Sequence, residues 1–248
     1  YPKREMRAAW VTTAWSNDWP TTTGTSASNQ AAQKAEAQKY IQKLKAAGFN
    51  AVFFQVRGMS DRNYAKNSYT HNGTTITVNE PWTSYISGWG KRGTDPGWDP
   101  LAFWIDECHK QGMELHAWIN PYRFGNISVS GTNTTLSTEY PWNHSNDQAI
   151  INAGWIIGHH NPIHNGNASQ GMSYFILKPA LSEVKTRIMN VCKVLAYNYD
   201  MDGIVFDDYF YPDGINNNGT SAQDYPNYQT YLNGGGTMSI ENWRRNHI

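Results

Sequence analysis

Two adjacent carboxylates, Asp207 and Asp208, follow a short apolar run late in the chain. The run, Ile204-Val205-Phe206, is β-branched or aromatic and carries no charge, which predicts a buried strand. Carboxylates at the mouth of such a strand are costly to bury unless they are paired, hydrated or chemically used. In parallel α/β proteins, catalytic side chains sit at the carboxyl ends of strands, where loops enclose a cleft. The pair is therefore a candidate catalytic site; alternatively, one of the two caps a helix or accepts loop hydrogen bonds.

Polar and aromatic side chains also stand at other apolar runs. Arg57 ends the run Ala51–Arg57, and His116, Trp118 and Asn120 alternate along a later run, so they share one face of a regular strand. The candidates for hydrogen bonding to ligand hydroxyls or for stacking on rings are Arg57, His116, Trp118, Asn120, Tyr122, Arg123, Tyr209 and Tyr211. Each could instead anchor a loop or pack in the core, and His116 fits a core histidine equally well.

Four apolar stretches predict the strands that must position these side chains. They are residues 6–13, 51–57, 114–123 and 202–212. Amphipathic helical patterns lie between them, at residues 30–47, 101–110 and 181–199. Ser28 or Asn29 is the expected N-cap of the first helix, and Asp99 with Pro100 begins the second. This alternation predicts parallel strands joined by right-handed crossovers.

Long stretches between these elements, at residues 58–97, 124–171 and 213–236, are interpreted as loops. Loops of this length in a compact domain tend to be functional. Ser239 begins what looks like one more helix. A complete (β/α)8 barrel takes about 250 residues, yet the 248 residues here supply four principal strands. The prediction is a single α/β domain over residues 1–248, of the (β/α)8 TIM-barrel type with its N-terminal half to two-thirds present; a smaller open sheet is the alternative.

Charge and hydropathy exclude some classes of partner. Lys and Arg together number 20, as do Asp and Glu, so a polyanion such as nucleic acid is not the expected partner. No apolar run reaches the length of a transmembrane helix, and the mean hydropathy is −0.65. The chain starts at Tyr1 without a Met, which fits a removed export signal or a segment boundary. Its 11 Trp and 15 Tyr suit stacking on sugars as well as core packing.

Cysteine and histidine spacing does not favour a metal or a cofactor. Cys108 and Cys192 lack a CxxC neighbour and are expected to be free, buried thiols. His159, His160 and His164 have no acidic or cysteine partner at ligand spacing, so they are interpreted as solvated loop residues. No cofactor is expected.

Several motifs resemble, in content and order, the glycosyl-hydrolase-like family 10, which occurs in bacterial cell-envelope lipoproteins. The matching stretches are Ala9–Thr13, Phe53–Arg57, Gly97–Phe103, Leu115–Arg123 and Asp202–Pro212. The family is similar to the α-amylase clan of TIM barrels, in which the nucleophilic Asp ends the fourth strand in an Asp-Gly-Phe-Arg-x-Asp pattern. Here that pattern falls on Asp202, Gly203 and Asp207.

The chain departs from the clan pattern in two ways. The Arg two residues before the nucleophile is Val205 here, so Arg57 or Arg123 would have to supply a nearby cation. The clan's acid/base Glu ends the fifth strand and a third carboxylate ends the seventh, and both are expected beyond Ile248.

The resemblance implies a glycoside hydrolase. Such chemistry needs one carboxylic acid and a second carboxylate, but successive strand residues face opposite ways. Asp207 is therefore expected to act as nucleophile or charge stabiliser, and Asp208 to support it or to bind sugar hydroxyls from the rim. A non-catalytic carbohydrate-binding barrel is the main alternative, and a phosphate-handling barrel is disfavoured because no Gly-rich phosphate loop follows a strand.

The family's setting implies a bacterial envelope glycan as the partner, with peptidoglycan strands as the specific expectation. The protein is accordingly expected to be exported, to the periplasm, the outer membrane as a lipoprotein, or the cell surface. A lipid anchor would then lie upstream of Tyr1.

Overall fold

The chain is an α/β protein built on a four-stranded parallel sheet. In a computed structural model, the described residues are 5–130, 133–136, 144–161, 172–207, 210–211 and 224–248. The parallel strands are β1 (Ala8–Val11), β2 (Ala51–Arg57), β5 (Glu114–Ile119) and β10 (Gly203–Phe206), in the spatial order β1-β2-β5-β10. Each is parallel to its neighbour, as predicted, and β2 has the predicted bounds.

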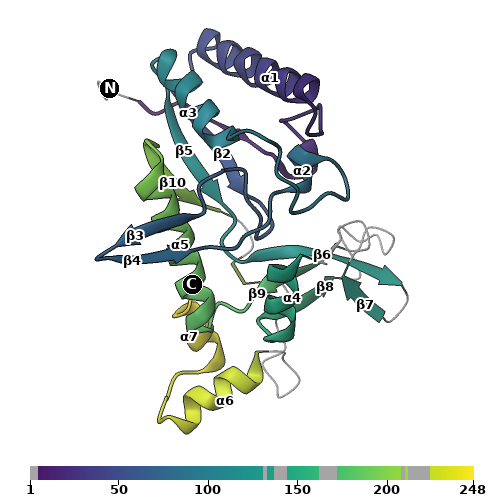
Figure 1. The fold of residues 1–248 in the computed structure, drawn as a ribbon. Coiled ribbons are helices and arrows are strands. Elements are labelled where there is room, and N and C mark those ends of the chain that lie inside the picture. Colours follow the sequence, from purple (N-terminus) through teal and green to yellow (C-terminus); the bar gives the residue numbers. More distant parts are fainter. Residues whose placement is uncertain (1–4, 131–132, 137–143, 162–171, 208–209, 212–223) are drawn as a thin grey trace.

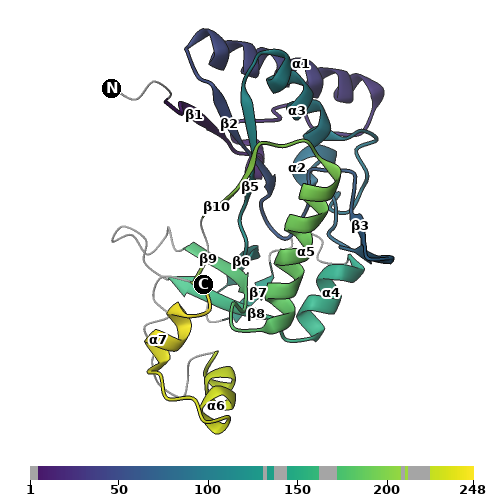
Figure 2. The same cartoon turned by 90° about the vertical axis from the view of Figure 1, so that its left-hand side faces the viewer.

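Three helices cross from one strand to the next. They are α1 (Ala27–Ala46), α3 (Pro100–Lys110) and α5 (Ser182–Asn198), and all three lie on the same face of the sheet (Figure 2). A doubly wound sheet carries helices on both faces, whereas a (β/α) barrel keeps them outside and winds its strands in sequence order. The sequential order and the one-sided helices are those of a partial (β/α) barrel, and the predicted fold class is confirmed.

Alternation along the strands separates a packed face from an inner face. Phe54, Leu115 and Ala117 are fully buried and pack against the helices in one apolar cluster. The residues between them face away from the helices, onto what we call the inner face. There Trp10 is 43% exposed and its ring meets Trp118 edge-on, with 4.8 Å between the ring centroids. The inner face therefore leaves large side chains accessible.

The stretch predicted as a loop after the third strand instead forms a second sheet. Its antiparallel strands are β6 (Arg123–Ser130), β7 (Asn133–Leu136), β8 (Ile156–Asn161) and β9 (Met172–Leu177), in the order β7-β6-β9-β8, with α4 (Ser145–Asn152) beside them. The sheet lies beyond the carboxyl ends of the parallel strands (Figure 1). The loop interpretation of residues 124–171 was wrong because β6 and β7 are rich in Asn, Ser, Thr and Gly, and pairing rather than intrinsic preference forms them. The apolar strand β9 follows that stretch.

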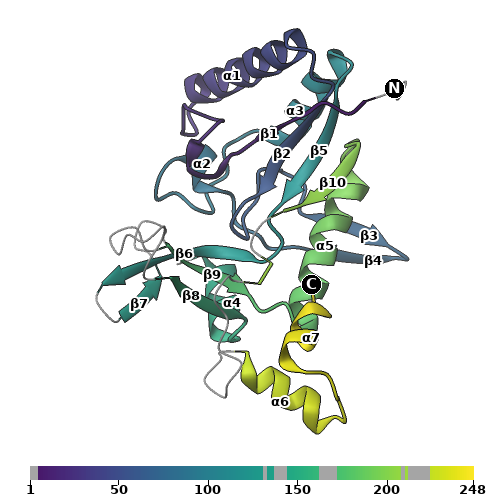
Figure 3. The ribbon, with the colours of Figure 1, turned by 180° about the vertical axis from the view of Figure 1, so that it is seen from behind.

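The other two predicted loops also contain regular structure. Residues 58–97 include β3 (Ser68–His71), β4 (Thr74–Thr77) and α2 (Ser84–Ser87), and residues 213–236 include α6 (Tyr225–Asn233). A short 3-10 turn, η1 (Ala14–Ser16), follows β1, and α7 (Ile240–Arg245) follows α6. Figure 3 shows α6 and α7 beyond the second sheet, far from β1 and β2.

Element ends show where local signals were sufficient. Asp99 caps α3 through Oδ1, which accepts from the Ala102 amide, and Ser239 caps α7, both as predicted. The N-cap of α1 is Ser26, not Ser28 or Asn29. β5 ends at Ile119, short of the predicted end at residue 123, so Tyr122 lies past the strand and Arg123 opens β6.

Both cysteines are free thiols, with Cys108 buried and Cys192 half-buried. Across the described segments, none of the helices is both long enough and apolar enough to span a bilayer.

Candidate functional site

A pocket of about 470 Å³ opens at the carboxyl ends of the parallel strands. It lies where β1, β2 and β5 end and β6 begins, and we call it the strand-end pocket. Its lining is polar and aromatic: Thr12, Ala14, Trp15, Asn17, Gln55, Trp118, Asn120 and Arg123. This is the edge at which (β/α) barrels place their active sites.

Two buried carboxamides hold the floor of the strand-end pocket. Gln55 Oε1 accepts hydrogen bonds from the backbone amides of Thr13 and Ala14, both at 2.9 Å. Its Nε2 donates to Asn120 Oδ1 at 2.6 Å. Asn120 Nδ2 then donates to the carbonyl oxygen of Asp207 at 2.7 Å. Because each amide has a donor and an acceptor partner, the chain of bonds fixes the orientation of both carboxamides.

Asp207 stands next to this pocket as an exposed side chain. Its backbone amide donates to the carbonyl oxygen of Ile119 at 3.2 Å, which continues the β10–β5 pairing by one residue. Within that pairing, Val205 lies opposite Trp118, so the alternation places Asp207 on the inner-face side with Asn120. Asp207 is not among the residues that line the pocket; its main chain is bound to one that is.

Asp202, the first acid of the same motif, lies at the opposite end of β10. Its Oδ2 accepts from the Leu115 amide at 2.8 Å and lies 2.9 Å from His109 Nε2. Burial alone would raise the pKa of Asp202, but these hydrogen bonds outweigh it and the pKa is lowered. Asp202 thus anchors the start of the strand that carries Asp207.

Aromatic and cationic groups form one wall of the pocket. The Arg123 guanidinium lies over the Trp15 ring, 4.6 Å from its centroid, in a cation–π arrangement. Trp15 is 46% exposed. Trp118 is buried, and among the described residues its indole Nε1 has no hydrogen-bond partner. The wall therefore offers a flat exposed ring and a cation.

Arg57 does not reach this pocket, contrary to the expectation that it lies on the rim. It is completely buried, and its Nε donates to both Glu80 carboxylate oxygens at 2.8 and 3.0 Å. The reason is a β-bulge: Gln55 pairs with Trp118, but Arg57 pairs with Ile119. The bulge turns Arg57 away from the inner face.

Arg57 instead positions the chain that carries the pocket residues. Its Nη1 donates to the carbonyl oxygens of Asn120 at 2.7 Å and Pro121 at 2.9 Å. Its Nη2 donates to Ser60 Oγ at 3.0 Å, and Ser60 Oγ donates to the carbonyl oxygen of Arg123 at 3.1 Å. Buried hydrogen bonds from Arg57 and Ser60 thereby hold the main chain of residues 120–123 in place.

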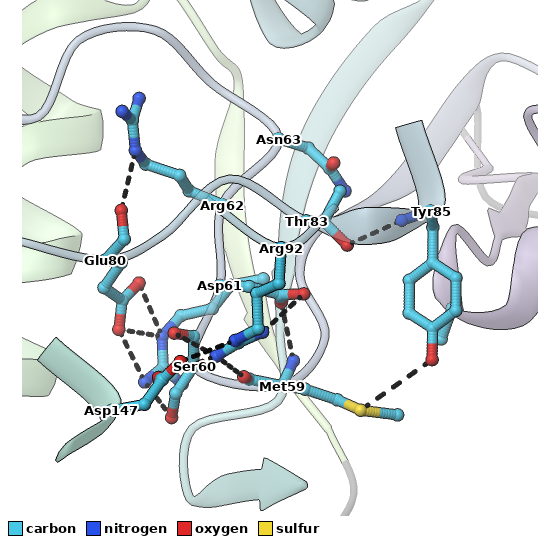
Figure 4. A network of polar contacts seen from close by, with 12 residues as sticks. Met59, Ser60, Asp61, Arg62, Asn63, Glu80, Thr83, Tyr85, Arg92 and Asp147 are labelled. Atoms are coloured by element: carbon cyan, nitrogen blue, oxygen red, sulfur yellow. Dashed lines mark hydrogen bonds and ion pairs between the residues drawn. The ribbon is translucent and has the colours of Figure 1, made fainter. Parts of the chain in front are cut away.

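The same buried network joins the 58–97 segment to the second sheet (Figure 4). Arg92 Nε lies 2.9 Å from Asp147 Oδ2 in α4, and Arg92 Nη1 lies 3.2 Å from Asp61. Burial alone would raise the pKa of Glu80, but Arg57 and Arg187 outweigh burial and the pKa of Glu80 is lowered. Glu80 is therefore held in its charged form, and all three carboxylates are ion-paired with arginines.

The remaining candidates from the sequence are not brought to the pocket. His116 lies nearer the amino end of β5, where its ring packs edge-on against Phe53 and its Nε2 is 2.9 Å from Glu114 Oε2. Tyr122 is buried and donates to the carbonyl oxygen of His247 at 3.4 Å. Tyr211 is half-buried, and burial raises its pKa. Asp208 and Tyr209 lie outside the described residues.

The structure thus brings together three of the predicted residues, Trp118, Asn120 and Arg123, and adds several that were not predicted. The added lining residues are Thr12, Ala14, Trp15, Asn17 and Gln55. The sequence did contain a signal for the missed residues, because the polar, Trp-rich turn after the first strand follows the carboxyl end of that strand. In the described part of the chain, no three His, Cys, Asp or Glu residues are grouped to hold a metal ion.

Comparison with known proteins gives one family. The family model described as "Glycosyl hydrolase-like 10" matches residues 5–248. "Glycosyl hydrolase YngK" of Bacillus subtilis is 30% identical over 99% of this chain and 40% of its own length. "Glycosyl hydrolase DigH" of Escherichia coli is 32% identical over 98% of this chain and 49% of its own length. The chain therefore spans less than half the length of these two relatives.

Among solved structures, an alpha-galactosidase from Thermus thermophilus overlaps with 83% of this chain and 31% of its own. The TM-score is 0.38 and the sequence identity 13%.

Proposed function

Because the chain belongs to the glycosyl hydrolase-like 10 family, we propose that it binds a glycan at the strand-end pocket and contributes Asp207 to hydrolysis of a glycosidic bond. The observation that carries the proposal is the bond from Asn120 to Asp207, at 2.7 Å. It couples a residue that lines the pocket to the exposed acid beside it.

The lining of the pocket supports a sugar as the ligand. Hydroxyl groups need both donors and acceptors, which the side chains of Asn17 and Thr12 supply. The exposed Trp15 ring offers a flat apolar surface for a pyranose ring. Pockets for small ligands combine such apolar faces with a few fixed polar groups, and their volumes start at about 300 Å³.

Asp207 is the acid best placed for chemistry in the described part of the chain. Asp61, Glu80 and Asp147 lie in buried ion pairs with arginines, and none of the three lines the strand-end pocket. Asp207 is exposed and would act as nucleophile or charge stabiliser. Hydrolysis also needs a second carboxyl group, which is not among the residues that line the strand-end pocket.

Arg123 takes the place of the cation that the clan pattern puts at Val205. It lines the pocket and lies against Trp15, whereas Arg57 is committed to Glu80 and to main-chain carbonyls.

The substrate we propose is a bacterial envelope glycan, with peptidoglycan strands as the specific candidate and an exported location for the protein. Both named relatives come from bacteria. A non-catalytic glycan-binding role is the second candidate, because the residues that line the strand-end pocket include no carboxyl group.

The test is incubation of the complete natural polypeptide with purified glycan strands, followed by measurement of new reducing ends. Asp207→Asn should abolish their formation while folding and strand binding persist. Asp200→Asn, an exposed acid ahead of β10, is the matched control. Strands that are bound without new reducing ends would favour the binding role, and undiminished turnover by the Asp207→Asn protein would refute the assignment of Asp207.

A further inference from the structure

A second pocket, of about 440 Å³, lies on the helix side of the fold. It is bordered by the end of β4, by α4 and by the first half of α5, and we call it the α5 pocket. Trp155, Glu183, Thr186, Arg187 and Asn146 are among its lining residues. None of the lining residues is shared with the strand-end pocket.

Two buried donors in this pocket lack partners. Arg187 Nε and Asn146 Nδ2 have no hydrogen-bond partner among the described residues. The Asn146 residue is 8% exposed and the Arg187 side chain 13%. Buried donors are almost always satisfied, because leaving one unpaired is destabilising. The two donors therefore indicate a ligand that brings hydrogen-bond acceptors.

The charges around the pocket favour a neutral ligand over an anion. Arg187 Nη2 lies 3.3 Å from Glu80 Oε1, so part of its charge is already balanced. Glu183, an exposed carboxylate, lines the same pocket. An anionic ligand would meet this carboxylate, whereas a hydroxyl can donate to it and accept from Arg187.

Trp155 supplies an apolar face. It packs against the second apolar cluster of the protein and is half-buried, and it also lines the α5 pocket. An indole held from behind by core residues is a rigid surface for the C–H face of a sugar ring.

We propose that the α5 pocket is a second carbohydrate site, which binds a neutral pyranose ring without cleaving it. Arg187 and Asn146 would donate to ring hydroxyls, Glu183 would accept from them, and Trp155 would carry the ring. The proposal goes beyond the hydrolytic function, because it requires neither Asp207 nor the strand-end pocket.

The experiment uses the natural polypeptide carrying Asp207→Asn, so that an oligosaccharide cannot be consumed, labelled with 5-fluorotryptophan. Trp155→Phe identifies the Trp155 fluorine resonance. Titration with chitotetraose, a neutral oligosaccharide, should shift that resonance in a saturable way. The resonances of Trp15 and Trp118 report separately on the strand-end pocket, so failure of one site is distinguishable from failure of the other.

A substitution that fills the pocket supplies the second arm. Thr186 is an exposed α5 residue in the pocket lining. Thr186→Trp should block stacking of the sugar ring on Trp155, so the dissociation constant obtained from the Trp155 resonance should rise by about tenfold or more. Ala196→Trp places the same side chain at an exposed site on the same helix, about 15 Å farther along the axis, and should leave the Trp155 titration unchanged.

A pair of monosaccharides tests the charge argument. N-acetylglucosamine and N-acetylmuramic acid differ by a lactyl group that carries a carboxylate, and the neutral sugar should bind the α5 pocket more tightly. The second carbohydrate site would be refuted if the Trp155 resonance did not shift with chitotetraose. It would also be refuted if the Thr186→Trp protein gave the same titration as the protein with Thr186. Tighter binding of N-acetylmuramic acid would overturn its assignment to a neutral ring.

Discussion

Asn120 Nδ2 donates a 2.7 Å hydrogen bond to the main-chain carbonyl oxygen of Asp207. The buried carboxamide that follows β5 therefore helps to position the acid that follows β10. The same Asn120 accepts from Gln55 on the other side, at 2.6 Å. Three strand ends are thus joined through two carboxamides. The pocket floor and the position of Asp207 are expected to respond together to changes at Asn120.

Replacing Asn120 with alanine should destabilise the fold and reduce turnover. Asn120→Ala leaves the buried Gln55 amide without its acceptor and the Asp207 carbonyl without its side-chain donor, which costs about 3 kcal/mol in the free energy of unfolding. Urea denaturation measures the loss. Asn152→Ala, at an exposed position in α4, should change the midpoint little, and an equal loss in both variants would contradict the account.

The Trp15 ring should contribute to glycan affinity more than to stability. It is 46% exposed and lies under Arg123, so Trp15→Ala removes a stacking surface with little core packing. The dissociation constant for a glycan oligosaccharide is expected to rise about tenfold, as measured by calorimetry. Trp89→Ala, an equally exposed tryptophan outside the pocket lining (54%), is the control and should bind normally.

Glu80 should stabilise the fold in a pH-dependent way. Its folded pKa is lowered because Arg57 and Arg187 outweigh the effect of burial, so its contribution is fully present above its ordinary pKa of 4.5. Glu80→Gln should lower the free energy of unfolding by about 3 kcal/mol at pH 7, since it breaks a buried ion pair.

As the pH falls below 4.5 and through the folded pKa, the difference in unfolding free energy between wild type and Glu80→Gln should narrow. If the difference in unfolding free energy stayed constant across that pH range, the charge of Glu80 would not contribute to stability. Glu107→Gln serves as the control, because its ion pair with Lys110 lies on the surface and such pairs contribute little.

Gly203 should tolerate no side chain while His116 keeps its place. A Cβ added at Gly203 would collide with the His116 ring, which is itself packed against Phe53. Gly203→Ala is expected to destabilise the protein by about 1–3 kcal/mol through overpacking. Thermal unfolding of the double variant Gly203→Ala/His116→Ala should show that the second substitution relieves the first; additive losses would argue against this contact.

The parallel sheet could be predicted from the sequence because its signals are local. A mostly apolar run with Gln55 inside it predicts β2 with its observed bounds, and Asp99 before Pro100 begins α3. Strands β6 to β8 of the second sheet could not be predicted, because they form through pairing between distant segments, such as Arg123 with Ile176. Helix α6 has no fully buried residue, and its tyrosines pack on one another and on Trp243 of α7 rather than on the main core.

The sequence predicts where the candidate site lies, at the carboxyl ends of the parallel strands, but predicts only some of the side chains that line it. Trp118, Asn120 and Arg123 follow from position at a strand end. Arg57 carries the same signal, but a bulge and a partner 23 residues away, Glu80, turn it into the core. Neither the bulge in β2 nor the Arg57–Glu80 ion pair can be recognised from the sequence around Arg57.

The most direct measurement of the central claim is a crystal structure of the Asp207→Asn protein in complex with chitotetraose. The account predicts a pyranose ring in the strand-end pocket, in contact with Trp15 and Trp118, with residue 207 within hydrogen-bond distance of the sugar. An oligosaccharide ordered elsewhere on the molecule, with the strand-end pocket holding only water, would contradict it.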